Sequence, residues 1–274
     1  MPLSQTKKAQ AFATLHARPG AFVLPNPWDA GSARMLASIG FEALATSSGA
    51  EAAVLGRRDG SVTRAEALAH ARLIVEATDL PVSADLEKGF GDTPDDVAAT
   101  IREAGAIGLV GGSIEDATGQ SGPRIYDIDL AAARIASAVA VARAMPFKFM
   151  VTARAENFIR GNPDLDDTIR RLQAYERAGA DVLMAPGLPD LAAVRKVCAS
   201  LQRPFNFMAG IKGKSFPVAE LAAAGVKRIS LASSLYRAAI TGALNAAREV
   251  KGDGTFHYTE SLLSTPDLNA FLLD

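Results

Sequence analysis

Two carboxylates, Asp85 and Glu87, follow a short apolar run in the segment 81–92, and a glycine-broken loop comes after them. Side chains on a strand alternate between its two faces, so we expect both carboxylates to point the same way. Like charges held that close repel each other unless a positive charge lies between them. A hard divalent cation that prefers oxygen ligands, Mg²⁺ or Mn²⁺, would relieve this repulsion. A polar strand end that runs into a solvated loop explains this segment equally well.

Polar residues also follow other apolar runs, and together they could form one site. The candidates are Ser48, Gly49, Glu115, Asp116, Arg154, Glu156, Asn206, Ser233 and Ser234. Carboxylates from neighbouring strands would hold a cation, while Arg154 offers a planar guanidinium to a substrate carboxylate. Taken singly, Asp59 is also consistent with a turn cap, and Arg154 with an internal ion pair. Their convergence on strand ends favours a shared site, because scattered surface charge would not fall repeatedly at these positions.

The scaffold that would bring these strand ends together is a repeat of apolar run, turn and amphipathic helix. The apolar runs predict strands at 21–24, 42–46, 82–85, 107–115, 147–153, 182–185, 205–208 and 228–231. Eight strand–helix units in about 250 residues predict an α/β fold, a TIM-type (β/α)8 barrel with its site at the C-terminal strand ends. An open doubly wound sheet is the alternative, but no G-x-G-x-x-G follows the first strand. We expect one domain over 1–274, with an N-terminal helix in 1–20 and a C-terminal helical segment in 252–274.

Composition narrows the class of protein. The chain has 274 residues, of which 49% are hydrophobic and 22% charged, with a net charge of −1. No basic run indicates binding to nucleic acid or to a membrane surface, and no apolar segment suits a signal peptide or a membrane span. We therefore expect a cytoplasmic protein that acts on a small molecule. The single cysteine, Cys198, excludes an internal disulfide and a cysteine-rich metal site, and we expect it to fill core space on a helix.

Two other chemistries fit the sequence poorly. A histidine-bound zinc is not expected, because no histidine lies at a predicted strand end. We expect all three histidines at the surface: His16, His70 and His257. A Schiff-base enzyme needs a lysine inside the barrel, but Lys148 and Lys227 lie at strand beginnings. Lys88 has the opposite parity to Asp85 and Glu87, so we expect it to point away from them.

From Leu24 to about Leu244 the chain resembles the isocitrate lyase/phosphoenolpyruvate mutase superfamily. The segment 84–91, ADLEKGFG, is similar to its D-x-D-x-G-[YF]-G metal motif, and 113–116, SIED, is similar to its I-E-D motif. The segment 152–154, TAR, is similar to its A-R-T-D segment, with Glu156 where an aspartate is usual. The match is to 2-methylisocitrate lyase-like and carboxyphosphonoenolpyruvate phosphonomutase-like members. The lyases carry K-[KR]-C-G-H after the I-E-D strand, whereas the loop 117–124 of this chain contains neither cysteine nor histidine.

The resemblance implies a Mg²⁺-dependent or Mn²⁺-dependent barrel that binds small 2-oxo acids. It implies a metal site made of Asp85 as the direct ligand, with Asp59, Glu87 and Glu115 holding the metal's waters. Substrate contacts are expected from Ser48, Gly49, Ala50, Asp85, Arg154 and Asn206. Catalytic roles are expected for Asp59, Glu115 and Arg154. Members often form tetramers and exchange the last barrel helix between subunits, so we expect a homo-oligomer, either a tetramer or a dimer.

These expectations lead to one main hypothesis and two alternatives. An enzyme would act as a lyase or decarboxylase on a small 2-oxo or 2-hydroxy (di)carboxylate, such as oxaloacetate or a methylisocitrate-like acid, through a metal-stabilised enolate. The loop cysteine that would quench the enolate is missing, and decarboxylation fits better because water can protonate the enolate carbon. The first alternative is a binding protein for 2-oxoglutarate or pyruvate with little or no activity. The second is a mutase or hydrolase of the P–C bond of phosphonopyruvate.

Overall fold

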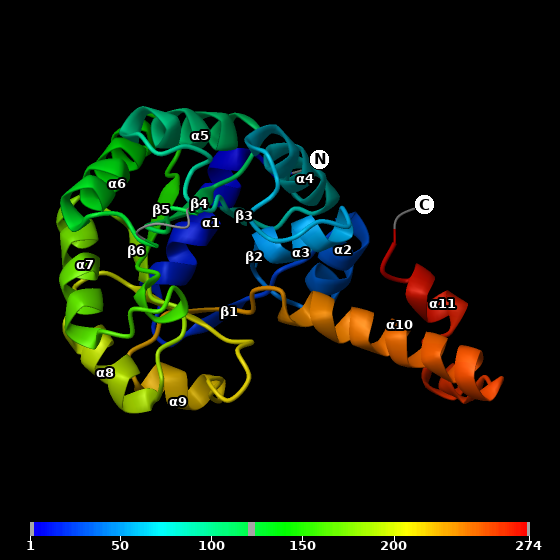
Figure 1. The fold of residues 1–274 in the computed structure, drawn as a ribbon. Helices are drawn as coiled ribbons and strands as arrows, with labels where there is room; N and C mark the ends of the chain where they lie inside the picture. Colours follow the sequence, from blue (N-terminus) through cyan, green and yellow to red (C-terminus); the bar gives the residue numbers. More distant parts are fainter. Residues whose placement is uncertain (1–2, 120–123, 273–274) are drawn as a thin grey trace.

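The computed structural model describes residues 3–119 and 124–272, and a barrel of parallel strands lies at its centre (Figure 1). The strands are β1 (Phe22–Leu24), β2 (Leu44–Ala45), β3 (Val82–Asp85), β4 (Gly111–Glu115), β5 (Met150–Arg154), β6 (Val182–Met184), β7 (Phe205–Met208) and β8 (Arg228–Ser230). They pair in the order β1-β8-β7-β6-β5-β4-β3-β2. Between β1 and β2, Ala45 N donates to Pro25 O at 3.0 Å and nearly closes the ring. The predicted α/β fold, a TIM-type (β/α)8 barrel, is confirmed.

Helices form a ring around the strands and cover the outer face of the barrel (Figure 1). They are α2 (Ala30–Ser38), α4 (Arg64–Ala77), α5 (Pro94–Ala106), α6 (Ile128–Arg143), α7 (Leu165–Arg177), α8 (Leu191–Ala199) and α9 (Val218–Ala223). Reciprocal capping boxes begin three of these helices: Asp29 with Ser32, Thr63 with Glu66 and Thr93 with Asp96. Each box satisfies backbone N–H groups of the first turn and so fixes where the helix begins after its loop.

The N-terminal helix α1 (Gln5–Ala17) closes the barrel at the N-terminal ends of the strands (Figure 1). Phe12 and Leu15 of α1 pack there with Phe22 and Met150 in a cluster separate from the main core. His16 is only 6% exposed, so its predicted surface position is wrong. The reason is that α1 is a plug and not an outer helix, so one of its faces is buried against the strands.

The C-terminal part of the chain leaves the barrel. Figure 1 shows α10 (Ser234–Asp253) leading away from the ring of helices, followed by the 3₁₀ helix η2 (His257–Ser261) and by α11 (Thr265–Asn269). None of these three elements contains a buried residue. Within the described ranges, no helix is long and apolar enough to cross a membrane.

Candidate active site

A cavity of about 750 Å³ opens at the C-terminal ends of the strands, and each of the eight strands contributes to its wall. The predicted site residues that line it are Ser48, Gly49, Asp59, Asp85, Glu87, Glu115, Arg154 and Asn206. Ala50 lies one residue further along α3 (Ser48–Val54), is fully buried, and is not part of the lining. Eight of the nine predicted site residues therefore line one cavity. The helix α3, which begins at the expected substrate contacts, was not predicted.

Arg154 is the centre of the charged network at the cavity rim. Its Nη1 atom lies 2.8 Å from Asp85 Oδ1, and its Nη2 atom lies 3.0 Å from Glu115 Oε2 and 2.9 Å from Glu156 Oε1. Burial alone would lower the pKa of Arg154, but Glu156, Glu115 and Asp85 hold it well above its ordinary value. The guanidinium is thus paired internally, which was the alternative considered for this residue, and a substrate would have to share it with these carboxylates.

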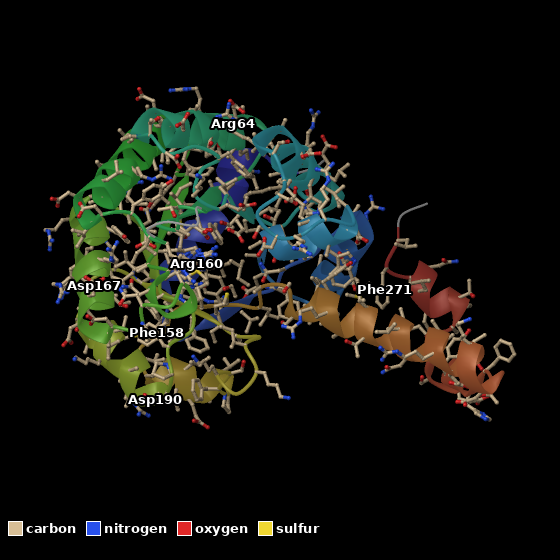
Figure 2. All side chains as sticks on the ribbon, viewed as in Figure 1. Arg64, Phe158, Arg160, Asp167, Asp190 and Phe271 are labelled. Carbon is tan, nitrogen blue, oxygen red and sulfur yellow. The ribbon has the colours of Figure 1, made fainter. Side chains whose placement is uncertain are left out.

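Arg160 is a second cation of this network, and the sequence analysis missed it. It follows the 3₁₀ helix η1 (Asn157–Ile159), and Figure 2 shows it over the middle of the ring of helices. Its Nη2 atom donates to Glu115 Oε1 at 3.1 Å, and its Nε atom donates to Glu156 Oε2 at 3.3 Å. The four-residue spacing from Glu156 is the signal that could have revealed it.

Asp116 supports the rim from behind the cavity wall. Its carboxylate, in a residue only 2% exposed, accepts hydrogen bonds from Tyr175 Oη at 2.6 Å, Arg171 Nη1 at 3.1 Å and the backbone N of Glu156 at 2.8 Å. These contacts tie the end of β4 to β5 and α7, and they fix the backbone that carries Glu156. Asp116 is therefore a positioning residue.

Asp85 joins the ends of β2 and β3. Its Oδ2 atom accepts from Ser48 Oγ at 3.0 Å, and its backbone N donates to Thr46 Oγ1 at 3.0 Å. Burial would raise the pKa of Asp85, but Arg154 and the Ser48 hydrogen bonds lower it below its ordinary value. The carboxylate is consequently ionised. It already binds Ser48, the first residue of the segment 48–50 that is expected to contact the substrate and is called the cradle below.

Asp85 and Glu87 both line the cavity, as predicted, but Glu87 does not share a strand with Asp85, so strand alternation is not the reason. β3 ends at Asp85, and Glu87 has a φ of +48°, in the left-handed region. The chain turns at this point, yet the side chain still reaches the cavity wall. Burial, and then Asp85 and Asp59, raise the pKa of Glu87 to about 7. This carboxyl group therefore exchanges its proton near neutral pH.

Gly49 allows Asp59 to approach the cradle. A Cβ atom added to Gly49 would lie 3.3 Å from Asp59 Oδ2, closer than most side-chain contacts. Behind the cradle, Glu51 of α3 is 2% exposed, and its Oε2 atom lies 3.5 Å from His70 Nδ1. Burial, followed by Glu87 and Asp85, raises the pKa of Glu51 to about 7. A second carboxyl group near the site thus holds its proton more firmly than an ordinary glutamate.

Lys88 lines the cavity mouth, contrary to the expectation that it points away. Its Nζ atom donates to Asp92 Oδ1 at 2.5 Å and to Thr118 O at 3.1 Å. The loop after β3 turns at Glu87, so strand parity does not apply to Lys88. The guanidinium of Arg134, on α6, donates to the backbone carbonyls of Lys88 and Gly91. Together these contacts bind the loop after β3 to the loop after β4.

The sequence model of a protein family described as phosphoenolpyruvate phosphomutase matches residues 12–251 of this chain. The chain belongs to this family. A candidate lyase/mutase from Burkholderia cenocepacia J2315 is 51% identical, and its crystal structure aligns with a TM-score of 0.96 over 97% of this chain and 96% of that one. A crystal structure of 2,3-dimethylmalate lyase aligns at 26% identity and a TM-score of 0.86 over 96% and 94% of the two chains. An oxaloacetate decarboxylase from Ectopseudomonas mendocina (strain ymp) is 29% identical over 88% of this chain and 84% of its own length.

This family membership confirms the predicted superfamily of lyases and mutases, for which the resemblance implies a divalent cation. The cavity has the donor chemistry for one, since its charged wall consists mainly of carboxylates, which are hard oxygen ligands. In 3–119 and 124–272, however, no three His, Cys, Asp or Glu side chains are arranged as a metal site, so Asp85, Glu87 and Glu115 do not form a ready-made cage. One or two carboxylates with several waters is the usual arrangement for Mg²⁺. A cation held by Asp85 would compete with Arg154 for the same carboxylate.

Proposed function

We propose that this member of the phosphoenolpyruvate phosphomutase family is a Mg²⁺-dependent lyase or decarboxylase that cleaves a carbon–carbon bond of a small 2-oxo or 2-hydroxy diacid. The observation that carries the proposal is the charge of the cavity rim. Five carboxylates face two arginines and one lysine there: Asp59, Asp85, Glu87, Glu115 and Glu156 against Arg154, Arg160 and Lys88. Burial, followed by neighbouring carboxylates, raises the pKa of Glu87 and of Glu115. A divalent cation would favour the ionised form of these groups and offset its charge. The likeness to an oxaloacetate decarboxylase and to 2,3-dimethylmalate lyase supports this class of substrate.

The side chains of the rim suit this chemistry. A bound divalent cation would polarise a keto oxygen and stabilise the negative charge that develops there when the neighbouring bond breaks. Ser48 and Gly49 present a hydroxyl group and an open backbone beside Asp85, where a carboxylate of the substrate would lie. Arg154 and Arg160 provide positive charge for that carboxylate. Glu87 exchanges a proton near neutral pH, which is the property required of a general acid or base.

The substitution Asp85→Asn tests the proposal, because it removes the charge of the expected metal ligand and keeps its shape. We expect pyruvate release from oxaloacetate or 2,3-dimethylmalate to fall about 10³-fold. The rise in melting temperature that Mg²⁺ causes in the wild type should disappear in the same variant. Protein-free reactions must be subtracted, since oxaloacetate loses carbon dioxide spontaneously in the presence of Mg²⁺. Asp95→Asn on the exposed face of α5 is the matched control and should behave as the wild type.

Turnover that persists in the wild type with excess EDTA would overturn the metal-dependent mechanism. A second candidate function, binding of a 2-oxo acid without catalysis, is favoured by the loop after β4, where neither cysteine nor histidine is available as an acid. That function would appear as Mg²⁺-dependent binding with no product after hours. The release of phosphate from phosphonopyruvate would instead indicate P–C bond chemistry.

We also propose that the chain forms a homo-oligomer through its C-terminal part. α10 carries an apolar stripe at helical spacing that includes Tyr236, Ile240 and Leu244, and Ile240 and Leu244 are 47% and 45% exposed. Beyond α10, Phe256, Leu262 and Leu263 are each at least 60% exposed. Several exposed large apolar side chains on successive elements are typical of an interface between subunits.

A further inference from the structure

Below its acidic rim, the cavity has a floor of the opposite charge. Arg228 begins β8 and lines the cavity, although its residue is only 3% exposed. Its Nε atom donates to Asn206 Oδ1 at 2.8 Å, and its Nη2 atom donates to Thr152 Oγ1 at 2.8 Å. Its Nη1 atom lies 3.4 Å from His16 Nε2. The guanidinium is thus held from β5, β7 and the plug helix α1.

All of these partners are neutral. His16 Nδ1 lies 2.8 Å from Phe12 O, and burial and Arg228 lower the pKa of His16 to about 3, so its ring carries no charge. Among the carboxylates of 3–119 and 124–272, none forms an ion pair with Arg228. Burial accordingly lowers the pKa of Arg228 to about 9, with no acid to counter it. A buried charge without a counter-charge costs several kcal/mol, so an apolar residue would serve a purely structural role better.

Other buried arginines of the chain are compensated. Arg154 pairs with three carboxylates, and Arg171 pairs with Asp116 and Asp167. Arg134 makes no ion pair in the described residues and burial lowers its pKa, but Tyr126, Asp92 and Asp96 oppose this shift. Arg228 therefore differs from the rest in facing a cavity as an uncompensated cation.

The guanidinium still has donors to offer. Arginine carries five N–H groups, of which the contacts with Asn206, Thr152 and His16 use three. Asn206 is fixed in turn, because its Nδ2 atom donates to Ser230 Oγ at 3.1 Å while its Oδ1 atom faces Arg228. The cation is positioned in advance, and within the described residues one hydrogen of each Nη group has no partner and is available to an anion.

The depth of Arg228 sets the length of the molecule that could reach it. Its partner Thr152 precedes Arg154 by two positions on β5, so the guanidinium lies about 6–7 Å below the level of Arg154. A diacid of four or five carbons covers this depth once the hydrogen bonds to its carboxylates are included. Its keto-carboxylate end would lie at the rim and its distal carboxylate at the floor.

We propose that Arg228, positioned by Asn206, is a specificity-determining residue that binds the distal carboxylate of a 2-oxo or 2-hydroxy diacid at the floor of the cavity. This inference rests on the proposed function and adds the orientation of the substrate. Loss of carbon dioxide would remove the carboxylate that the guanidinium binds, so this ion pair stabilises the bound diacid against decarboxylation. The subsite therefore favours cleavage of an internal carbon–carbon bond over decarboxylation.

The test compares two ligands of equal chain length, 2-oxoglutarate and 2-oxopentanoate, which differ only in the distal carboxylate. Calorimetric titration in Mg²⁺ should give the wild type at least a 10-fold preference for 2-oxoglutarate. In Arg228→Met, we expect the Kd of 2-oxoglutarate to rise 10- to 100-fold and that of 2-oxopentanoate to stay within 2-fold. Asn206→Asp keeps the guanidinium but gives it an internal carboxylate, and it should abolish the preference as well. Arg72→Met, an exposed arginine on α4, is the control and should bind as the wild type.

Three results would overturn the inference. One is a wild type that binds both ligands equally well. Another is an equal loss of affinity for both ligands in Arg228→Met and Asn206→Asp, which would indicate a merely structural role. The third is a wild type that binds neither ligand; turnover of oxaloacetate or 2,3-dimethylmalate then decides separately whether the proposed function fails as well. Melting temperatures of all variants identify any that do not fold, and Asn206→Asp then decides the question because it adds an ion pair to the floor.

Discussion

At the scale of single residues, Glu51 shows how burial and neighbouring charge set the proton affinity of a carboxyl group behind the cavity. Its Oε1 atom is buried and makes no hydrogen bond within the part of the chain that the structure describes. The folded protein keeps the proton of Glu51 up to about pH 7, whereas the unfolded chain releases it near pH 4.5. Folding is therefore penalised progressively as the pH rises from 4.5 to 7, and the penalty is complete above pH 7.

Glu51→Gln should relieve this penalty, since glutamine has the same shape and no charge. We expect the variant to match the wild type at pH 4.5 and to exceed its free energy of unfolding by up to about 3 kcal/mol at pH 8. Urea unfolding of both proteins in EDTA at a series of pH values measures the difference. Glu76→Gln changes an exposed glutamate of α4 and should shift the free energy of unfolding by less than about 0.5 kcal/mol at each pH. A gain for Glu51→Gln that is the same at pH 4.5 and pH 8 would contradict this account.

At the scale of elements, α1 separates a polar barrel interior from solvent. Phe12 is fully buried in this plug, and its ring meets that of His16 edge-on at 4.7 Å. Phe12→Ala should lower the free energy of unfolding by about 3–5 kcal/mol, because it leaves a cavity beneath the floor that holds Arg228. Denaturant titration measures this loss. Leu73→Ala is the control, because it removes a side chain that is 57% exposed on α4. A comparable loss of the free energy of unfolding in that variant would contradict a stabilising role of the buried Phe12 side chain.

The elements also explain which parts of the site could be predicted. The ends of β3, β4 and β5 were found because an apolar run followed by charged residues is visible locally. The turn at Glu87 was not, since a left-handed backbone conformation at a glutamate has no simple signal in the sequence. Arg228 was overlooked because its significance depends on Asn206, Thr152 and His16, which lie far from it along the chain. The turn at Glu87 and the role of Arg228 thus depend on the tertiary fold and could not be predicted from local sequence patterns.

At the scale of the whole molecule, the exposed C-terminal elements suggest that one chain is not the complete assembly. If α10 packs against another subunit, a charge on its apolar stripe should break that contact. Ile240→Asp combined with Leu244→Asp should reduce the mass measured by light scattering after gel filtration from an oligomer to a monomer. Asn245→Asp adds one negative charge beside the stripe and should leave the oligomer intact. A wild type that is monomeric at micromolar concentration would refute the proposed assembly.

The place where the barrel nearly closes has a consequence for motion. β1 and β2 form no strand ladder within the described chain, and Asn26, after β1, instead donates to Thr46 O, after β2, at 2.8 Å. The same side chain accepts from Leu231 N, after β8, at 2.9 Å. Each other pair of neighbouring strands is joined by a ladder, so local breathing should concentrate at this seam. Thr46 lies on it, two residues before Ser48. A ligand seated on Ser48 would therefore stiffen the weakest joint of the sheet as it binds.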